Sequence, residues 1–144
     1  MEFKKALQYH QSGQLQKAQE IYRKILEVNP DHCDSLHLLG VIANQDGNND
    51  MAVKLIGRAI KINSKEPIYY NNIGNAFKAQ GNFKQAVFNY RKALELKPDF
   101  AEALVSMGSG YVELGRLKEA ISCFKKALQF KQNFADRCHG LCCR

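Results

Sequence analysis

Three asparagines crowd one short stretch of the sequence, Asn71, Asn72 and Asn75 in "NNIGN". Asparagine is a poor helix former because its amide competes for nearby backbone groups, so three of them within one predicted helix need a reason. An amide offers both donors and an acceptor, which suits pairing with the backbone of an extended peptide. The alternative is a merely solvated helix face, and we favour peptide contact.

A second stretch that could do chemistry is the C-terminal "CHGLCCR", in which Cys138, His139, Cys142 and Cys143 could ligate a metal. Structural zinc sites usually take two ligands from each of two separated segments, and the sequence offers no second segment. An inert tail is the favoured interpretation, with intermolecular oxidation in vitro as the alternative. We expect no metal and no cofactor.

Enzyme signatures are missing from the sequence. It contains neither a glycine-rich phosphate loop nor a His-Glu-x-x-His motif, and its histidines, His10, His32, His37 and His139, are scattered. Only His37 is expected to face the same side as the asparagines, and a lone histidine there is more often a contact than a catalyst. The protein is expected not to be an enzyme.

Composition favours an ordinary globular protein in a reducing compartment, so we expect a cytoplasmic location. The chain is 45% hydrophobic and 24% charged over 144 residues, with no apolar run long enough to span a membrane. Its five cysteines are odd in number and unevenly spaced, unlike a secreted disulfide framework.

The elements that must position these residues follow a 34-residue repeat. Small residues recur at this interval in three independent series: Ala18, Ala52, Ala86 and Ala120; Gly13, Gly47, Gly81 and Gly115; and Gly40, Gly74 and Gly108. Helices that cross closely need small residues, and glycines that follow a helix allow a turn. The pattern predicts four antiparallel helix pairs, at 2–12 and 15–28, 33–46 and 49–62, 67–80 and 83–96, and 101–114 and 117–130.

At these residues the sequence resembles the tetratricopeptide repeat (TPR) family, and "NNIGNAFKAQGNFKQAVFNYRKALELKPDFAEA" is similar to the arrays of O-linked N-acetylglucosamine transferases. The resemblance implies an all-α fold, a right-handed superhelix or α-solenoid whose first helices line a concave groove. The expected TPR domain covers 1–134, with repeats at about 1–32, 33–66, 67–100 and 101–134. Residues 135–144 read as a truncated fifth repeat or tail.

The groove that this arrangement predicts is polar but not basic. Its expected residues are His37, Val41, Asn44, Asn71, Asn72, Asn75, Lys78, Ser106 and Ser109. The first helices carry three lysines against five carboxylates, whereas windows 13–29, 47–63, 81–97 and 115–131 have net charges of +1, +2, +3 and +4. The basic charge is therefore expected on the convex side, chiefly as a solvated surface, and nucleic-acid or membrane partners are not expected.

Two known groove types can be tested against the sequence. The asparagine ladder of the transferases is matched only by Asn72, since Lys4, Leu38, Ser106 and Gly140 occupy the equivalent positions. Chaperone-binding domains grip a carboxylate with residues that correspond here to His37, Val41, Asn72, Glu102 and Ser106. Only the middle asparagine fits, and Glu102 would repel a carboxylate, so a carboxylate clamp is not expected.

The predicted function is a non-catalytic scaffold that binds a protein or peptide segment in its groove. One alternative is the substrate-selecting region of a larger glycosyltransferase. The other is a self-assembling scaffold, a homo-oligomer formed through the uncapped C-terminal end, where Phe124, Leu128 and Phe130 would stack on another copy.

Overall fold

The computed structural model describes the backbone of residues 2–142 and the side chains of residues 2–133. Over this range the chain forms helices and no strand, which confirms the all-α solenoid. The helices are α1 (Glu2–Gln11), α2 (Leu15–Val28), α3 (Cys33–Gln45), α4 (Asn49–Ile62), α5 (Pro67–Ala79), α6 (Phe83–Leu96), α7 (Ala101–Glu113) and α8 (Leu117–Cys142). The ends of the first seven agree with the sequence prediction to within one residue.

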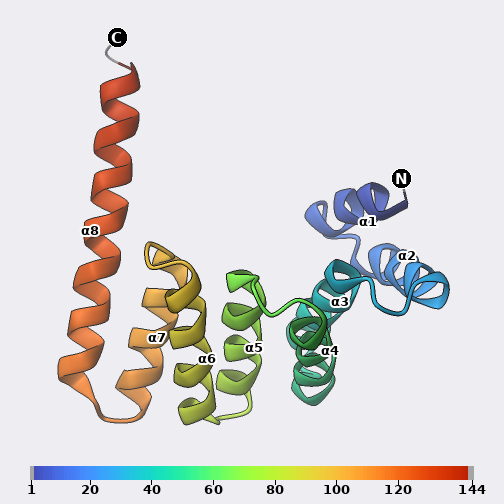
Figure 1. Ribbon diagram of the computed structural model, residues 1–144, viewed down its shortest axis with the longest axis horizontal. Coiled ribbons are helices and arrows are strands. Elements are labelled where there is room, and N and C mark those ends of the chain that lie inside the picture. The colour runs from blue at the N-terminus through green and yellow to red at the C-terminus, as the bar shows by residue number, and fades with distance from the viewer. Residues whose placement is uncertain (1, 143–144) are drawn as a thin grey trace.

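The prediction for the last helix was wrong. It was expected to end at 130, but α8 continues without interruption to Cys142 and projects beyond the other helices (Figure 1). Pro30 and Pro98 follow the ends of α2 and α6, whereas the equivalent residue in α8 is Gln132, which keeps its N–H and does not clash with the preceding turn. The assignment of 135–144 to a truncated repeat stays a prediction, and the side chains of Cys138, His139, Cys142 and Cys143 lie outside the described residues.

A glycine turn closes each pair, and in the second and third pairs a capping asparagine follows it. The turn glycines Gly13, Gly47, Gly81 and Gly115 have φ angles of 83°, 85°, 80° and 76°. This left-handed conformation costs glycine little, because it has no Cβ. Asn48 and Asn82 then cap α4 and α6, each accepting a hydrogen bond from the backbone N–H three residues later.

The pairs stack in chain order and the stack is curved. Besides the contacts between consecutive helices, first helices of neighbouring pairs touch, α3 with α5 and α5 with α7. No contact of that extent joins two second helices in the described part of the chain. The first helices therefore crowd on one side, which we call the inner face and define by α3, α5 and α7. The second helices, α4, α6 and α8, spread over the outer face.

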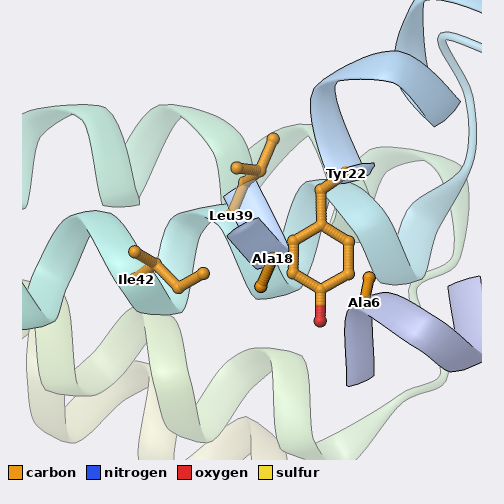
Figure 2. Packing of buried hydrophobic residues seen from close by; sticks show 5 residues of the cluster. All are labelled: Ala6, Ala18, Tyr22, Leu39 and Ile42. Carbon is orange, nitrogen blue, oxygen red and sulfur yellow. The ribbon is translucent and has the colours of Figure 1, made fainter. Parts of the chain in front are cut away.

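Small residues let the two helices of a pair approach each other. In the first pair, Tyr22 lies beside Ala6 and Ala18 and is fully buried (Figure 2). In the third pair, a Cβ added to Gly74 would lie 2.6 Å from the ring of Tyr90. Gly108 and Phe124 repeat this arrangement in the fourth pair, at 2.7 Å. The small positions of the repeat are thus filled by large side chains from the opposite helix.

Candidate functional site

The predicted site residues all lie on the first helices that form the inner face. His37, Val41 and Asn44 are on α3, Asn71, Asn72, Asn75 and Lys78 on α5, and Ser106 and Ser109 on α7. Since α3 touches α5 and α5 touches α7, the fold brings these three groups onto neighbouring helices. Asn72 and Asn75 are one turn apart and occupy the middle of this row.

A chain of hydrogen bonds holds these two central asparagines. The Nδ2 of Asn72 lies 2.7 Å from Nε2 of His37 on the neighbouring helix, and Asn75 Nδ2 donates to Asn72 Oδ1 at 3.5 Å. At the other end, the hydroxyl of Tyr90 donates to Asn75 Oδ1 at 2.6 Å. The chain links α3, α5 and α6, so the two amides are oriented by groups from three helices.

Tyr90 reaches the inner face because Gly74 leaves room for it. Tyr90 belongs to the second helix of its pair, and its ring lies against the backbone of α5 at Gly74. The ring is fully buried, and its hydroxyl meets polar groups, Asn75 on α5 and Ser106 on α7. Burial raises the pKa of Tyr90, so the phenol stays protonated and remains a donor. The repeat pattern could not reveal this polar contact, because it depends on how α5 and α6 pack.

His37 is buried next to Asn72 and does not face outward. Its side chain is 5% exposed, and its ring lies 4.7 Å from the ring of Tyr69, measured between centroids. Tyr69 in turn donates to Asp34 Oδ1 at 2.7 Å. Burial lowers the pKa of His37 to about 4, so the imidazole is neutral at pH 7 and Nε2 can accept from Asn72. His37 was expected to contact a ligand directly, but its side chain is too buried for that.

Asn71 also departs from the prediction that all three asparagines point outward. It is 1% exposed, and neither its Oδ1 nor its Nδ2 has a hydrogen-bond partner among the described residues. An unpaired buried amide costs about 1–3 kcal/mol of stability. A helical spacing of three or four residues places Asn71 near the face of Asn75, but it could not reveal that the neighbouring helix covers that position.

The remaining predicted residues flank the central pair. Val41, Asn44, Lys78, Ser106 and Ser109 are all partly exposed. Asn44 Oδ1 is buried without a hydrogen-bond partner in the described part of the chain. The structure thus leaves Asn72 and Asn75 as the central accessible amides, with polar and small apolar neighbours on both sides.

This arrangement has spare hydrogen-bonding capacity. Each amide nitrogen carries two N–H groups, and the chain of hydrogen bonds uses one on Asn72 and one on Asn75. Both side chains are partly exposed, so one N–H on each can donate to a ligand. Two donors at fixed positions, one helical turn apart, suit the carbonyl groups of an extended chain.

Other chemistry receives no support from the described side chains. Within residues 2–133 no three His, Cys, Asp or Glu side chains converge as a metal site would require. Burial raises the pKa of both Cys33 and Cys123, so neither thiol is activated as a nucleophile. None of the helices in the described range is long and apolar enough to cross a membrane.

Comparison with known proteins agrees with the repeat pattern. Four models described as tetratricopeptide repeat match the chain, at residues 3–32, 21–54, 67–100 and 101–134. Human tetratricopeptide repeat protein 7B is 32% identical over 85 residues, which cover 59% of this chain and 10% of that protein. The chain therefore spans about a tenth of the length of that relative.

Solved structures share the fold along most of the chain. A crystal structure of MamA superposes with a TM-score of 0.85 at 26% identity, covering 94% of this chain and 79% of MamA. An O-GlcNAc transferase mutant from Thermobaculum terrenum superposes with a TM-score of 0.75 at 28% identity, covering 76% of this chain and 21% of the transferase. By its repeat matches and by its stacked helix pairs, this chain belongs to the tetratricopeptide repeat family.

Proposed function

We propose that the protein is a non-catalytic interaction scaffold whose inner face binds an extended peptide segment of a partner protein. Membership of the tetratricopeptide repeat family supports the scaffold role. The observation that carries the peptide site is the pair of pre-oriented amides, Asn72 and Asn75, each with one N–H to spare. Groups fixed before binding lose little entropy when the ligand arrives.

In this proposal the asparagines pair with the peptide backbone, and the flanking residues contact its side chains. Val41 offers an apolar contact, Ser106 and Ser109 offer hydroxyls, and Lys78 offers a positive charge. His37 and Tyr90 act as positioning residues, because they hold the two amides and do not themselves face the ligand. Recognition of the backbone gives affinity for many sequences, whereas the flanking contacts select among them.

The test is a peptide-display selection on the wild-type chain, followed by affinity measurement on two variants. Asn72→Leu with Asn75→Val installs the residues found at Leu38 and Val41 in the preceding repeat, and should weaken binding at least tenfold. Asn75→Asp keeps an acceptor for Tyr90 but removes the spare donor, and should weaken binding by a smaller factor. The matched control, Lys54→Leu with Ser122→Val, adds apolar groups to exposed outer positions and should bind like wild type.

Thermal unfolding of each variant separates loss of the site from loss of the fold. A folded double variant that still binds the selected peptides with wild-type affinity would overturn the proposed site. Failure to select any peptide that binds the wild-type chain would overturn the proposed function itself.

A second candidate function is self-assembly through the C-terminal end, and the exposure of α8 favours it. Ile121 and Leu128 are 53% and 66% exposed. Val87, the equivalent of Ile121 in the preceding pair, is only 5% exposed because α7 covers it. Phe124, which the sequence analysis included in this surface, instead packs against Gly108 within its own pair.

The two ends of the array differ, which decides how copies could pair. First helices elsewhere carry apolar residues where α1 has Glu2 and Lys5, so the N-terminal end is polar. Head-to-tail stacking would bury those charges against Ile121 and Leu128, at a large desolvation cost. Self-assembly would therefore pair α8 with α8 of a second copy, burying apolar surface on both sides.

The similarity to the transferase from Thermobaculum terrenum keeps the third candidate open, a substrate-selecting region of a longer glycosyltransferase. Asn72 is the only residue of the expected ladder, and Leu38 and Ser106 at equivalent positions lack an amide. A nucleotide-sugar-binding domain encoded downstream in the same reading frame would decide for this candidate.

A further inference from the structure

A hollow lies on the outer face, away from the asparagines of the inner face. It has a volume of about 380 Å³ and is lined by Lys84, Val87, Phe88 and Arg91 of α6 and by Leu114 and Arg116 of the turn that follows α7. The α7–α8 turn and the first half of α6 lie at the same edge of the array (Figure 1). The volume falls within the range of pockets that hold small ligands or side chains.

The lining combines three positive charges with an apolar floor. Lys84, Arg91 and Arg116 are exposed cations, and Val87 and Leu114 supply the floor. Phe88 is 52% exposed, an unusual degree for a phenylalanine, and Lys92 Nζ lies 5.2 Å from the centre of its ring. No carboxylate is among the six lining residues; Glu119 lies nearby but is paired with Arg116 at 2.9 Å.

Tyr111 holds both arginines in place. Arg91 donates to the Tyr111 hydroxyl at 3.1 Å, and the guanidinium carbon of Arg116 lies 5.0 Å from the centre of the same ring. Stacking of a guanidinium on an aromatic ring restricts its motion. Arg91 and Arg116 are therefore fixed cations rather than freely moving surface charges, and Nε and Nη2 of Arg116 already donate to Glu119.

The other pairs of the array provide an internal comparison. At the first junction Gln19 donates to Asp46 at 3.4 Å, and at the second Gln80 donates to Asp50 at 2.6 Å, so a hydrogen bond spans each gap. At the third junction, Leu114 occupies the repeat position that Asp46 has at the first junction and Gln80 at the second. Its side chain has no polar atom. Leu114 cannot make the equivalent hydrogen bond, and the side-chain hydrogen bond across this junction runs instead from Arg91 to Tyr111, which leaves the hollow beside Leu114 open.

The cations are also specific to this junction. The equivalent of Lys84 in the second pair is Asp50, and the equivalent of Phe88 is Lys54. Arg116 occupies the position at which Asn48 and Asn82 cap their helices. Replacing a capping asparagine by a residue that cannot cap costs about 1 kcal/mol, and the contacts of Arg116 with Tyr111 and Glu119 offset part of that loss.

The geometry points to a docking site for an acidic peptide segment that carries a bulky apolar side chain. The apolar side chain would enter the hollow beside Phe88, Val87 and Leu114. Flanking carboxylates would pair with Lys84 and Arg91 and would share the Arg116 guanidinium with Glu119. Bidentate pairing with the arginines gives this contact directional preference. A flat anionic surface such as a lipid bilayer could meet the charges but could not fill the hollow, so a peptide uses more of the site.

The experiment measures binding of a fluorescently labelled acidic peptide, DELFED, to the whole chain by anisotropy. A second peptide, DEGSED, keeps the charges and lacks the apolar pair. The wild-type chain should bind DELFED saturably and at least tenfold more tightly than DEGSED. Equal affinity for both peptides would reduce the site to general charge attraction and would overturn the proposal.

The decisive variant is Lys84→Asp with Leu114→Gln, which reproduces the residues of the second junction, Asp50 and Gln80. A hydrogen bond should then close the hollow, so this variant is expected to fold with wild-type thermal stability and to bind DELFED at least tenfold more weakly. Lys65→Asp makes the same change of net charge in the exposed loop before α5 and should change affinity less than twofold.

Three further results would contradict the proposal. The wild-type chain could fail to bind DELFED saturably, or the double variant could bind it like wild type. The third result concerns other partners. The wild-type chain could bind phosphatidylserine vesicles or a DNA duplex but not DELFED, and the double variant could lose that binding. The hollow would then belong to a different class of partner. Phe88→Ser, which installs the residue found at the equivalent position Ser122, should weaken DELFED binding without affecting binding driven by charge alone.

Discussion

Asn71 is the clearest case in which a single side chain works against stability. Its amide is 1% exposed and lacks hydrogen-bond partners among the described residues. Asn71→Leu keeps a similar shape and removes the unpaired polar atoms, so it should raise the free energy of unfolding by about 1–2 kcal/mol. Urea denaturation measures this change; a decrease in stability would mean that the amide has a partner in solution.

His37 makes stability depend on pH. Its pKa is about 4 in the folded chain and about 6.5 when unfolded, because burial disfavours the charged imidazole. Its contribution is complete above pH 6.5 and is lost as the pH falls toward 4, since only the unfolded state then binds the proton. The shift corresponds to a loss of at most roughly 3 kcal/mol, and burial of His10 lowers its pKa in the same direction.

His37→Gln isolates this effect, because glutamine stays neutral and can still accept from Asn72. Urea denaturation across the same pH interval should show a much smaller loss of stability in the variant than in the wild-type chain. Parallel pH profiles for the two proteins would show that the imidazole is not buried as the structure has it.

At the scale of helices, packing between the two helices of a pair requires glycine at position 74 of α5, although glycine is a poor helix former. Gly74→Ala would place a Cβ 2.6 Å from the ring of Tyr90, whereas Gly57→Ala would place one 3.9 Å from Ile73. Alanine favours a helix by about 1 kcal/mol over glycine, so Gly57→Ala should stabilise by about that amount. Gly74→Ala should destabilise by about 1–3 kcal/mol, because overpacking outweighs the gain.

Thermal and urea unfolding of the two alanine variants give the comparison directly. The Gly74→Ala variant should also disturb the contact from Tyr90 to Asn75, which links this packing position to the inner face. Stabilisation by both substitutions would show that the pairs are looser than the structure indicates.

Much of the architecture could be predicted because the same pattern of small residues and turn glycines occurs in every repeat. Seven helices began and ended within one residue of expectation, since each glycine turn recurs at 34-residue spacing. The eighth could not be predicted in full, because Gln132 only permits a helix to continue and does not require it.

The site was predictable in position but not in detail. Spacing placed Asn72 and Asn75 on the inner face. It could not show that His37 is covered, or that Tyr90 passes beside Gly74 to reach Asn75, since both depend on how neighbouring helices pack. The hollow between α6 and the α7–α8 turn was missed because its charges had been treated as a solvated surface.

At the scale of the whole molecule, the exposed face of α8 predicts concentration-dependent association. Light scattering of the wild-type chain should show a mass that rises from monomer toward dimer, and Ile121→Glu with Leu128→Glu should hold it at monomer. The control Val28→Glu alters an 89% exposed apolar residue at the end of α2 and should associate like wild type. A monomeric wild-type chain at every concentration would exclude the pairing of α8 with α8.

The two faces proposed to bind partners are chemically distinct, which makes them separable in one protein. The central groups of the inner face are neutral amides and hydroxyls with one flanking cation, Lys78, whereas the hollow on the outer face is lined by Lys84, Arg91 and Arg116. Binding at the hollow should therefore weaken more steeply with salt than binding at the inner face.

The most direct test of the central claim is a map of NMR chemical-shift changes when a display-selected peptide is added to the isotopically labelled chain. The largest changes should fall on α3, α5 and α7, and the side-chain amide signals of Asn72 and Asn75 should shift. Changes confined to the outer helices, with those two amide signals unmoved, would contradict the claim.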